Sequence, residues 1–300
     1  MIRYNPKTWN LLLLFKGSII RRLWVGMLLL TILTVVLCLL QIKYAIINIK
    51  MSSALPGYMG AALGLLLVFR NNTAYDKWWE ARKILGSLVN VSRSMAITLT
   101  NILPADNQEK SDLVRLIQGF CFALKEHLRA GVILEELKML NPADYEKISL
   151  AVNKPNAITN LMMGKISLLH HNGNLNDMQQ FHLIGQVTEM VDILGKCERI
   201  RKTPIPIAYV FLLKFFIIIY VLIIPFGLIV SMGWSTIPLV LFIYYIMMSI
   251  VLTAEEIENP FGHDLNDLLV DEICKNIEAN VEEISNTPSV RFNPSSSPND

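Results

Sequence analysis

Apolar residues in this chain gather in four long runs that are separated by charged stretches. The first run, LWVGMLLLTILTVVLCLL at 23–40, has 18 residues without a charge and is long enough to cross a bilayer as a helix. The second has 16 residues, about 24 Å at 1.5 Å per residue, so it needs shelter from neighbouring helices. The pattern predicts four transmembrane helices, at about 23–42, 54–69, 207–231 and 236–254.

Residues 70–203, between the second and third runs, form a polar block with helical rather than strand periodicity. Apolar side chains recur at helical spacing in two sets: Trp78, Trp79, Ile84, Leu85, Leu88, Val89 and Met95, then Leu113, Leu116, Ile117, Phe120, Leu124 and Leu128. The segments LPADNQEKSD, LNPADYEK and HHNGNLND supply the helix breaks. We therefore expect an all-α integral membrane protein with a large cytosolic helical region.

The chain boundaries follow from the same pattern. The cytosolic region is expected at about 70–203 and 262–282, and residues 283–300 have the composition of a disordered tail. Residues 1–282 are then a single domain.

Basic residues set the orientation of the spans. Clusters within 7–22, 70–83 and 196–202 flank the first three spans, and cytoplasmic flanks carry such an excess of Lys and Arg. The link SMGWST between the last two spans has no charge and fits the opposite side. Lys43 and Lys50 argue mildly against this topology but are outnumbered. We expect a multi-pass protein of the cell (inner) membrane with both termini cytoplasmic.

Composition narrows the function classes. The chain is 53% hydrophobic and 17% charged, with a net charge of +2, so the sequence predicts no nucleic-acid partner. Four separate cysteines indicate buried thiols rather than disulfides or zinc. The five histidines show no metal spacing, and no catalytic or phosphate-binding motif is present, so we expect neither an enzyme nor a cofactor. His170 and His171 fit a solvated loop edge.

The second span carries small residues and an apolar face. Gly60 and Gly64 form a G-x-x-x-G pair that permits close helix approach. Ala61, Leu65 and Phe69 lie four residues apart, on one face of a helix. Two interpretations stay open: a helix-packing seam, or several copies of the helix around an axis, whose apolar rings would form a constriction that gates by dewetting. Arg70 follows directly, either at the pore exit or as an interfacial anchor.

Three segments resemble the bestrophins, in particular their bacterial members: FRNNTAYDKWWEAR at 69–82, CERIRKTPIPIAY at 197–209 and EEIENPFGHDLNDL at 255–268. The resemblance implies a homopentameric ion channel with four membrane helices per subunit around one axial pore. It places the rings of the pore neck at Ala61, Leu65 and Phe69, and a lower aperture at Ile205.

The chain departs from the bestrophin pattern in two places. Ala61 is small where the family usually has a bulky residue, so the upper ring is expected to be wide. Animal bestrophins follow N-P-F-G with an acidic run that helps to bind Ca²⁺, whereas here too few carboxylates follow Gly262. We expect no metal site there, and we expect Asp264 and Asn266 to cap the next helix instead.

Charged and aromatic residues mark the ends of the spans. Glu255, Glu256 and Glu258, at the end of the fourth span, are expected to pair with Arg70 or Arg82, because both motifs lie at the same membrane depth. The adjacent tryptophans of the first motif are expected to pack against the cytosolic helices.

The resulting expectation is a channel that passively conducts small monovalent ions, with chloride as the first choice and membrane lipid and further copies of the chain as partners. Apolar rings carry no sign of charge, so a cation channel of the same fold stays open. A membrane-anchored scaffold and a secondary transporter also stay open, although the two pairs of spans lack the mutual similarity of inverted repeats.

Overall fold

The computed structural model describes residues 19–44, 54–104, 106–129, 131–264 and 266–287, and within them every regular element is a helix. The chain divides into two compact units, Met1–Trp79 with Pro204–Asp267, and Glu80–Thr203 with Leu268–Asp300. The sequence pattern predicts a single domain over residues 1–282. The helix α2 (Ala54–Ile102) continues from the first unit into the second.

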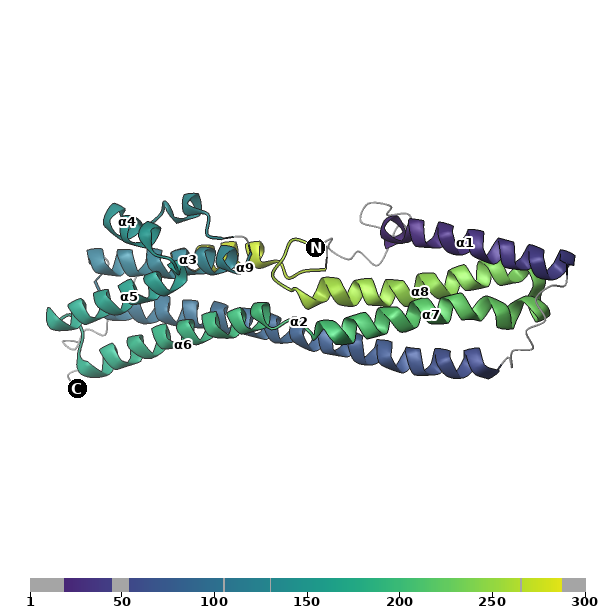
Figure 1. Ribbon diagram of the computed structural model, residues 1–300. Helices are drawn as coiled ribbons and strands as arrows, with labels where there is room; N and C mark the ends of the chain where they lie inside the picture. The colour runs from purple at the N-terminus through teal and green to yellow at the C-terminus, as the bar shows by residue number, and fades with distance from the viewer. Residues whose placement is uncertain (1–18, 45–53, 105, 130, 265, 288–300) are drawn as a thin grey trace, which may run out of the picture. The chain divides into compact units, whose positions relative to one another are not determined.

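The first unit contains the apolar helices. Besides the start of α2, these are α1 (Ile19–Tyr44), α7 (Ile207–Met232), the short η3 (Gly233–Ser235) and α8 (Thr236–Glu258). Figure 1 shows α7 and α8 side by side, and α1 packs against both. Their shared core combines buried residues of all four helices: Leu30, Leu63, Leu67, Leu213, Ile217, Tyr220, Val221, Ile224, Val240 and Val251.

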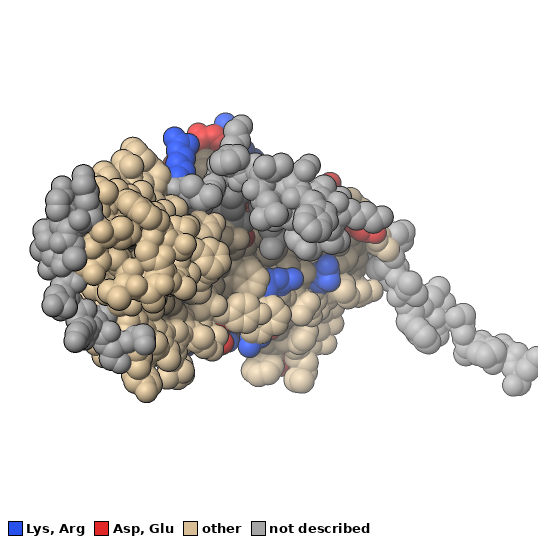
Figure 2. Space-filling model, turned by 90° about the vertical axis from the view of Figure 1, so that its right-hand side faces the viewer, with Lys and Arg blue, Asp and Glu red and all other residues tan. Residues whose placement is uncertain are grey.

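Apolar side chains also cover much of the outer surface of this unit. Phe211 and Val230 on α7 are 69% and 70% exposed, and α1 exposes Leu29 to 63%. In Figure 2, the described face is nearly all tan, with charged side chains only in small patches. Such a surface is costly in water and suits a hydrocarbon environment.

Two stretches of the described residues, Arg21–Ile42 and Asp177–Glu258, contain segments long and apolar enough to cross a membrane. They include α1, α7 and α8, whose bounds agree with the predicted spans to within a few residues. The second predicted span, 54–69, lies outside both stretches, and its helix does not end at Phe69. It continues as one helix of 49 residues, so the predicted span and the first helix of the polar block are a single element.

The second unit is a helical bundle around α3 (Gln108–His127). It contains the end of α2 together with η2 (Leu134–Leu137), α4 (Pro142–Leu150), α5 (Lys154–His171), α6 (Asp177–Lys202) and α9 (Val270–Asn286). Helix α3 packs against α5 and α9, and α5 packs against α4 and α6.

Asparagine is the N-cap residue of four helices in this unit. The side chains of Asn107, Asn141, Asn153 and Asn176 each accept a hydrogen bond from a backbone N–H of the first turn of α3, α4, α5 and α6. Such caps satisfy main-chain donors that have no partner inside the helix. The three predicted breaks are confirmed, because each contains or precedes one of these starts.

The end of the chain differs from the prediction. Helix α9 begins at Val270, inside the stretch 262–282 predicted for the cytosolic region, and ends at Asn286, four residues beyond it. Its last residues therefore occupy the start of the predicted tail at 283–300. Residues 288–300 lie outside the described part of the chain.

Candidate ion pathway

The first half of α2 has one buried and one exposed apolar face. Leu63 and Leu67 are 4% and 3% exposed, whereas Leu65 and Phe69 are 57% and 56% exposed, and Ala61 is exposed as well. Residues four apart on a helix differ by about 40° in direction, so Ala61, Leu65 and Phe69 form one stripe. The three residues predicted for the pore neck therefore lie together on the outside of the single chain.

The two glycines of the predicted G-x-x-x-G seam have different surroundings. A Cβ atom at Gly60 would lie 2.8 Å from the hydroxyl oxygen of Tyr220 on α7, so this glycine permits a close contact. A Cβ atom at Gly64 would have no other heavy atom within 4 Å. Among the described residues of one chain, Gly60 belongs to a helix-packing seam and Gly64 does not.

Arg70 points away from the exposed stripe. Its side chain is 1% exposed, and its Nη2 lies 2.6 Å from Oε2 of Glu258 at the end of α8. The two predicted roles of Arg70, a charge at the pore exit or an interfacial anchor, stay predictions; on the helix its side chain is turned by about 100° from that of Phe69. Arg70 holds α2 to α8 through an ion pair that is largely shielded from water.

The carboxylate of Glu258 has a second partner. Its Oε1 accepts a hydrogen bond from the backbone N–H of Ile205, with 2.8 Å between nitrogen and oxygen. Ile205, the predicted lower aperture, is half-buried just before α7. One carboxylate thus joins the residue after Phe69 to the predicted aperture. In the sequence, Glu258 is one member of an acidic cluster, and nothing there distinguishes it from Glu255 and Glu256 as a site residue.

The other two glutamates of the cluster pair with different bases. Glu255 lies 2.6 Å from Nζ of Lys214 on α7, and Glu256 lies 3.1 Å from a guanidinium nitrogen of Arg22 on α1. The three glutamates were expected to pair with Arg70 or Arg82; Glu258 pairs with Arg70, and Glu255 and Glu256 pair with Lys214 and Arg22 instead. These pairs tie the end of α8 to three other helices.

The segment between α8 and α9 is folded by its own polar groups. Asp267 accepts the backbone N–H of Asp264 at 2.7 Å, and its side chain is 3% exposed. Burial raises the pKa of Asp267 to about 6. The prediction that Asp264 and Asn266 cap the next helix is wrong, because α9 begins after Leu269 and its start has no side-chain cap.

The predicted packing of the two tryptophans against the cytosolic helices stays a prediction, because the contact of Trp78 is with the segment between α8 and α9. Nε1 of Trp78 donates a hydrogen bond to the carbonyl of Asn266 at 3.1 Å. Trp79 is 45% exposed. Both rings stack with Tyr75, with centroids 6.1 to 6.4 Å apart.

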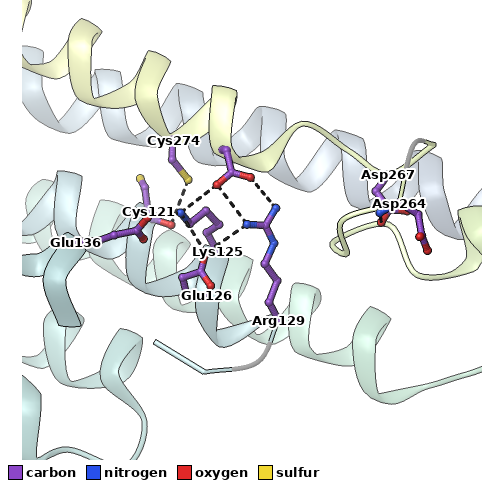
Figure 3. A network of polar contacts seen from close by, with 9 residues as sticks. Cys121, Lys125, Glu126, Arg129, Glu136, Asp264, Asp267 and Cys274 are labelled. Carbon is purple, nitrogen blue, oxygen red and sulfur yellow. Dashed lines mark hydrogen bonds and ion pairs between the residues drawn. The ribbon is translucent and has the colours of Figure 1, made fainter. Parts of the chain in front are cut away.

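Charged groups in the second unit form a structural network rather than a reactive site (Figure 3). Lys125 on α3 is 4% exposed and lies within 3.1 Å of carboxylate oxygens of Glu126, Glu136 and Asp271. Asp271 also pairs with Arg129 at 2.8 Å, and the pKa of Asp271 is lowered chiefly by its hydrogen bond to that guanidinium. The network therefore joins α3, η2 and α9 by opposite charges.

The cysteines and histidines also have structural surroundings. All four cysteines are free and buried, as predicted, and burial raises the pKa of Cys121 and Cys197 to about 12. His127 lies 2.7 Å from Glu198, and His170 lies 2.7 Å from Asp177. Over the described residues, no three His, Cys, Asp or Glu side chains converge as metal ligands would.

Similarity to known proteins identifies the family of this chain. A family model described as bacterial and fungal bestrophin protein matches residues 1–283. The chain belongs to the bestrophin family.

Relatives and solved structures agree with this membership. A voltage-dependent anion channel-forming protein of Synechocystis is 38% identical over 75% of each chain. Another protein of that name, from Nostoc, is 33% identical over 92% of this chain and 91% of its own. The crystal structure of a bacterial bestrophin homologue from Klebsiella pneumoniae has a TM-score of 0.82 at 28% identity, covering 87% of this chain and 98% of that one.

Each of the three bestrophin-like segments supplies one residue to a single contact. Arg70 comes from the segment at 69–82, Ile205 from that at 197–209 and Glu258 from that at 255–268. The family resides in membranes, and the names of these relatives describe channel-forming proteins rather than enzymes. The contact that joins the three segments adjoins the exposed stripe of α2, because Arg70 directly follows Phe69 in the chain.

Proposed function

We propose that five copies of this bestrophin form a membrane channel that passively conducts small monovalent anions, chloride first among them, through one axial pore. The observation that carries the proposal is the stripe of Ala61, Leu65 and Phe69. An apolar stripe that is exposed on one chain, on a helix whose opposite face is buried, can be covered by copies of itself around an axis.

The neck of this pore consists of rings of Ala61, Leu65 and Phe69, and Ile205 forms a lower aperture. Rings of Leu65 and Phe69 narrow the pore, and their apolar side chains disfavour water inside it. An ion that must shed its water to pass meets a free-energy barrier there. The ring of Ala61 is wider because its side chain is a single methyl group. Arg70, Glu255 and Glu256 belong to the support of the neck rather than to its lining, since each is held in an ion pair.

The anion assignment is supported by the relatives named as anion channel-forming proteins. One observation favours a cation channel of the same fold as the second candidate. Arg70 is neutralised by Glu258, whereas Asp76, seven residues beyond Phe69 and on the same side of α2, is exposed. A ring of such carboxylates would attract cations.

The topology that fits the basic clusters is a multi-pass protein of the inner membrane with both termini in the cytoplasm. α1, the start of α2, α7 and α8 are the four spans, surrounded by lipid. The second unit and α9 then lie on the cytoplasmic side.

Reconstitution in planar bilayers tests the function. Purified protein should give unitary currents, whose size exceeds any transporter turnover, and the complex in detergent should have the mass of five chains. In a salt gradient, a reversal potential near the chloride Nernst value supports the anion channel, and one near the cation value supports the second candidate. A pentamer without current would overturn the proposal, and it would favour the scaffold alternative.

A further inference from the structure

We infer that Glu258 is a positioning residue of the conduction pathway. Its carboxylate fixes Ile205 to α2 directly behind Phe69, so that the lower aperture and the end of the neck are held as one assembly. This inference rests on the proposed function, because it assigns a role to a contact between two proposed constrictions.

Both oxygens of the carboxylate are used at once. Oε2 lies 2.6 Å from Nη2 of Arg70, and Oε1 lies 2.8 Å from the backbone nitrogen of Ile205. Because Arg70 directly follows Phe69 on a continuous helix, holding the guanidinium fixes the rotation of α2 at the last ring of the neck. The same carboxylate therefore sets the position of both constrictions.

The backbone around Ile205 offers few hydrogen-bond donors that could fix its position. It stands between Pro204 and Pro206, which lack N–H groups, so its own N–H is the one main-chain donor of residues 204–206. Pro206, the residue before α7, gives no side-chain cap. The hydrogen bond to Glu258 consequently decides where this short segment lies.

The surroundings make this contact strong. The side chains of Arg70 and Glu258 are 1% and 18% exposed, so solvent and salt screen their attraction weakly. Hydrogen bonds to a charged group are shorter and stronger than neutral ones. Tyr209, in the first turn of α7, adds a second link by donating to the carbonyl of Leu66 on α2 at 3.2 Å.

Glu255 offers a matched control on the same helix. It also forms an ion pair within the first unit, with Lys214 at 2.6 Å, and its side chain is 32% exposed. A substitution there removes a carboxylate and an ion pair but leaves the Ile205 N–H bonded to Glu258.

Hydrogen exchange at the Ile205 amide tests the contact in the intact assembly. Glu258→Ala should speed exchange roughly tenfold, as expected for loss of a hydrogen bond to a charged acceptor. Glu258→Gln keeps an oxygen acceptor but loses the charge, so its exchange should lie between those of the wild type and Glu258→Ala. Glu255→Ala keeps Glu258 itself and should stay within about twofold of the wild type. Equal exchange in Glu258→Ala and wild type would overturn the inference.

Bilayer recordings test the consequence for the pore. Ile205→Ala should change the unitary conductance of the wild type, and its effect should fall by half or more in a Glu258→Ala background, where Ile205 is no longer held. Ile205→Ala effects of equal size in both backgrounds would contradict the positioning role. Loss of current from every variant and the wild type would overturn the proposed function instead, while amide exchange would still decide the contact.

Removing one partner leaves a buried charge, so Glu258→Ala carries a risk of misfolding. The double variant Arg70→Met/Glu258→Met replaces the pair with apolar side chains of similar length and also frees the Ile205 N–H. It should show the same fast exchange and the same weakened effect of Ile205→Ala. Wild-type behaviour of this variant would reject the inference.

Discussion

At the scale of single residues, Phe69 and Arg70 are neighbours in the chain that serve opposite faces of α2. Phe69 is 56% exposed and ends the apolar stripe, whereas Arg70 is 1% exposed and binds Glu258. A turn of about 100° between successive helical residues separates the two roles. The change from apolar to charged sequence at this point therefore reflects two faces of one helix: Phe69 lies on the exposed face, and Arg70 lies on the face that packs against α8.

Phe69→Ala should raise the unitary conductance about twofold or more, because it removes the last apolar ring of the proposed neck. Leu65→Ala should act in the same direction, and Ala61→Ser should do little. Leu222→Ala, at a 43% exposed site on α7, is a control for loss of an apolar side chain elsewhere. The measurement is single-channel current in bilayers. Currents insensitive to bulky and small substitutions at all three neck positions would show that the neck lies elsewhere.

Asp267 should make stability depend on pH. Burial raises its pKa to about 6 from an ordinary value of 3.8, so the folded state keeps a proton that the unfolded state releases. Its contribution to stability is therefore present at low pH and is lost as the pH rises from about 4 to 6. Asp267→Asn, which stays neutral, should be more stable than the wild type above that window, by about 3 kcal/mol, and similar to it below.

Thermal unfolding of both proteins in detergent at pH 4 and pH 7.5 measures this difference. Comparing the two proteins at each pH removes the effect of other titrating groups that they share. A stability difference that is the same at both pH values would contradict the assignment of the raised pKa to Asp267.

At the scale of elements, α2 performs two tasks along one helix of 49 residues. Its start packs into the core of the first unit through Leu63 and Leu67, and its end belongs to the second unit. The glycine at position 60 brings it close to α7.

Gly60→Ala should lower the thermal stability, because the added methyl group would lie 2.8 Å from the hydroxyl oxygen of Tyr220 and one of the two must move. The expected cost is about 1 kcal/mol, since overpacking of a well-filled site costs of that order. Tyr220→Phe removes the nearest atom and should restore much of the loss in a double variant. The melting temperature of the detergent-solubilised protein measures both effects.

Gly64→Ala is the matched control, since no other heavy atom lies within 4 Å of the position where its Cβ would stand. It should leave the stability of the single chain near that of the wild type. If Gly60→Ala were harmless, or if Tyr220→Phe gave no rescue, the close contact between α2 and α7 would not be a determinant of packing.

At the scale of the whole molecule, two units of different character share one chain. The first exposes large apolar side chains over α1 and α7, as a lipid-facing surface does. The second is held by asparagine caps and by the buried network around Lys125. The contrast supports a protein with one unit in the bilayer and one in water.

A cysteine at Ser235 should be labelled from outside the cell. Ser235 is exposed in η3, between α7 and α8, and the proposed topology places it on the side opposite the basic clusters. A membrane-impermeant maleimide should modify Ser235→Cys in intact spheroplasts. Met178→Cys, at a 76% exposed site of the second unit, should react only after permeabilisation.

The four native cysteines are buried and should react slowly, which keeps the background low. Labelling of Met178→Cys in intact spheroplasts, with Ser235→Cys protected, would invert the proposed topology.

The sequence by itself determined the local features of this protein. Helical periodicity, Asn-containing breaks and long apolar runs depend on neighbours a few residues apart, so they predicted the helices, the starts of α3, α4 and α6, and the stripe of Ala61, Leu65 and Phe69. The segments resembling bestrophins indicated the family. The boundary at 69–70 was visible too, but only as a change in composition.

Only the tertiary structure decided which charges meet. Arg70 and Glu258 are 188 positions apart, and three glutamates within four residues were equally plausible partners from their spacing alone. Helix rotation and packing chose between them: Glu258 reaches Arg70 and Ile205, while Glu255 and Glu256 reach Lys214 and Arg22. The identity of an ion pair depends on the distance between side chains in space, which periodicity along one helix does not contain.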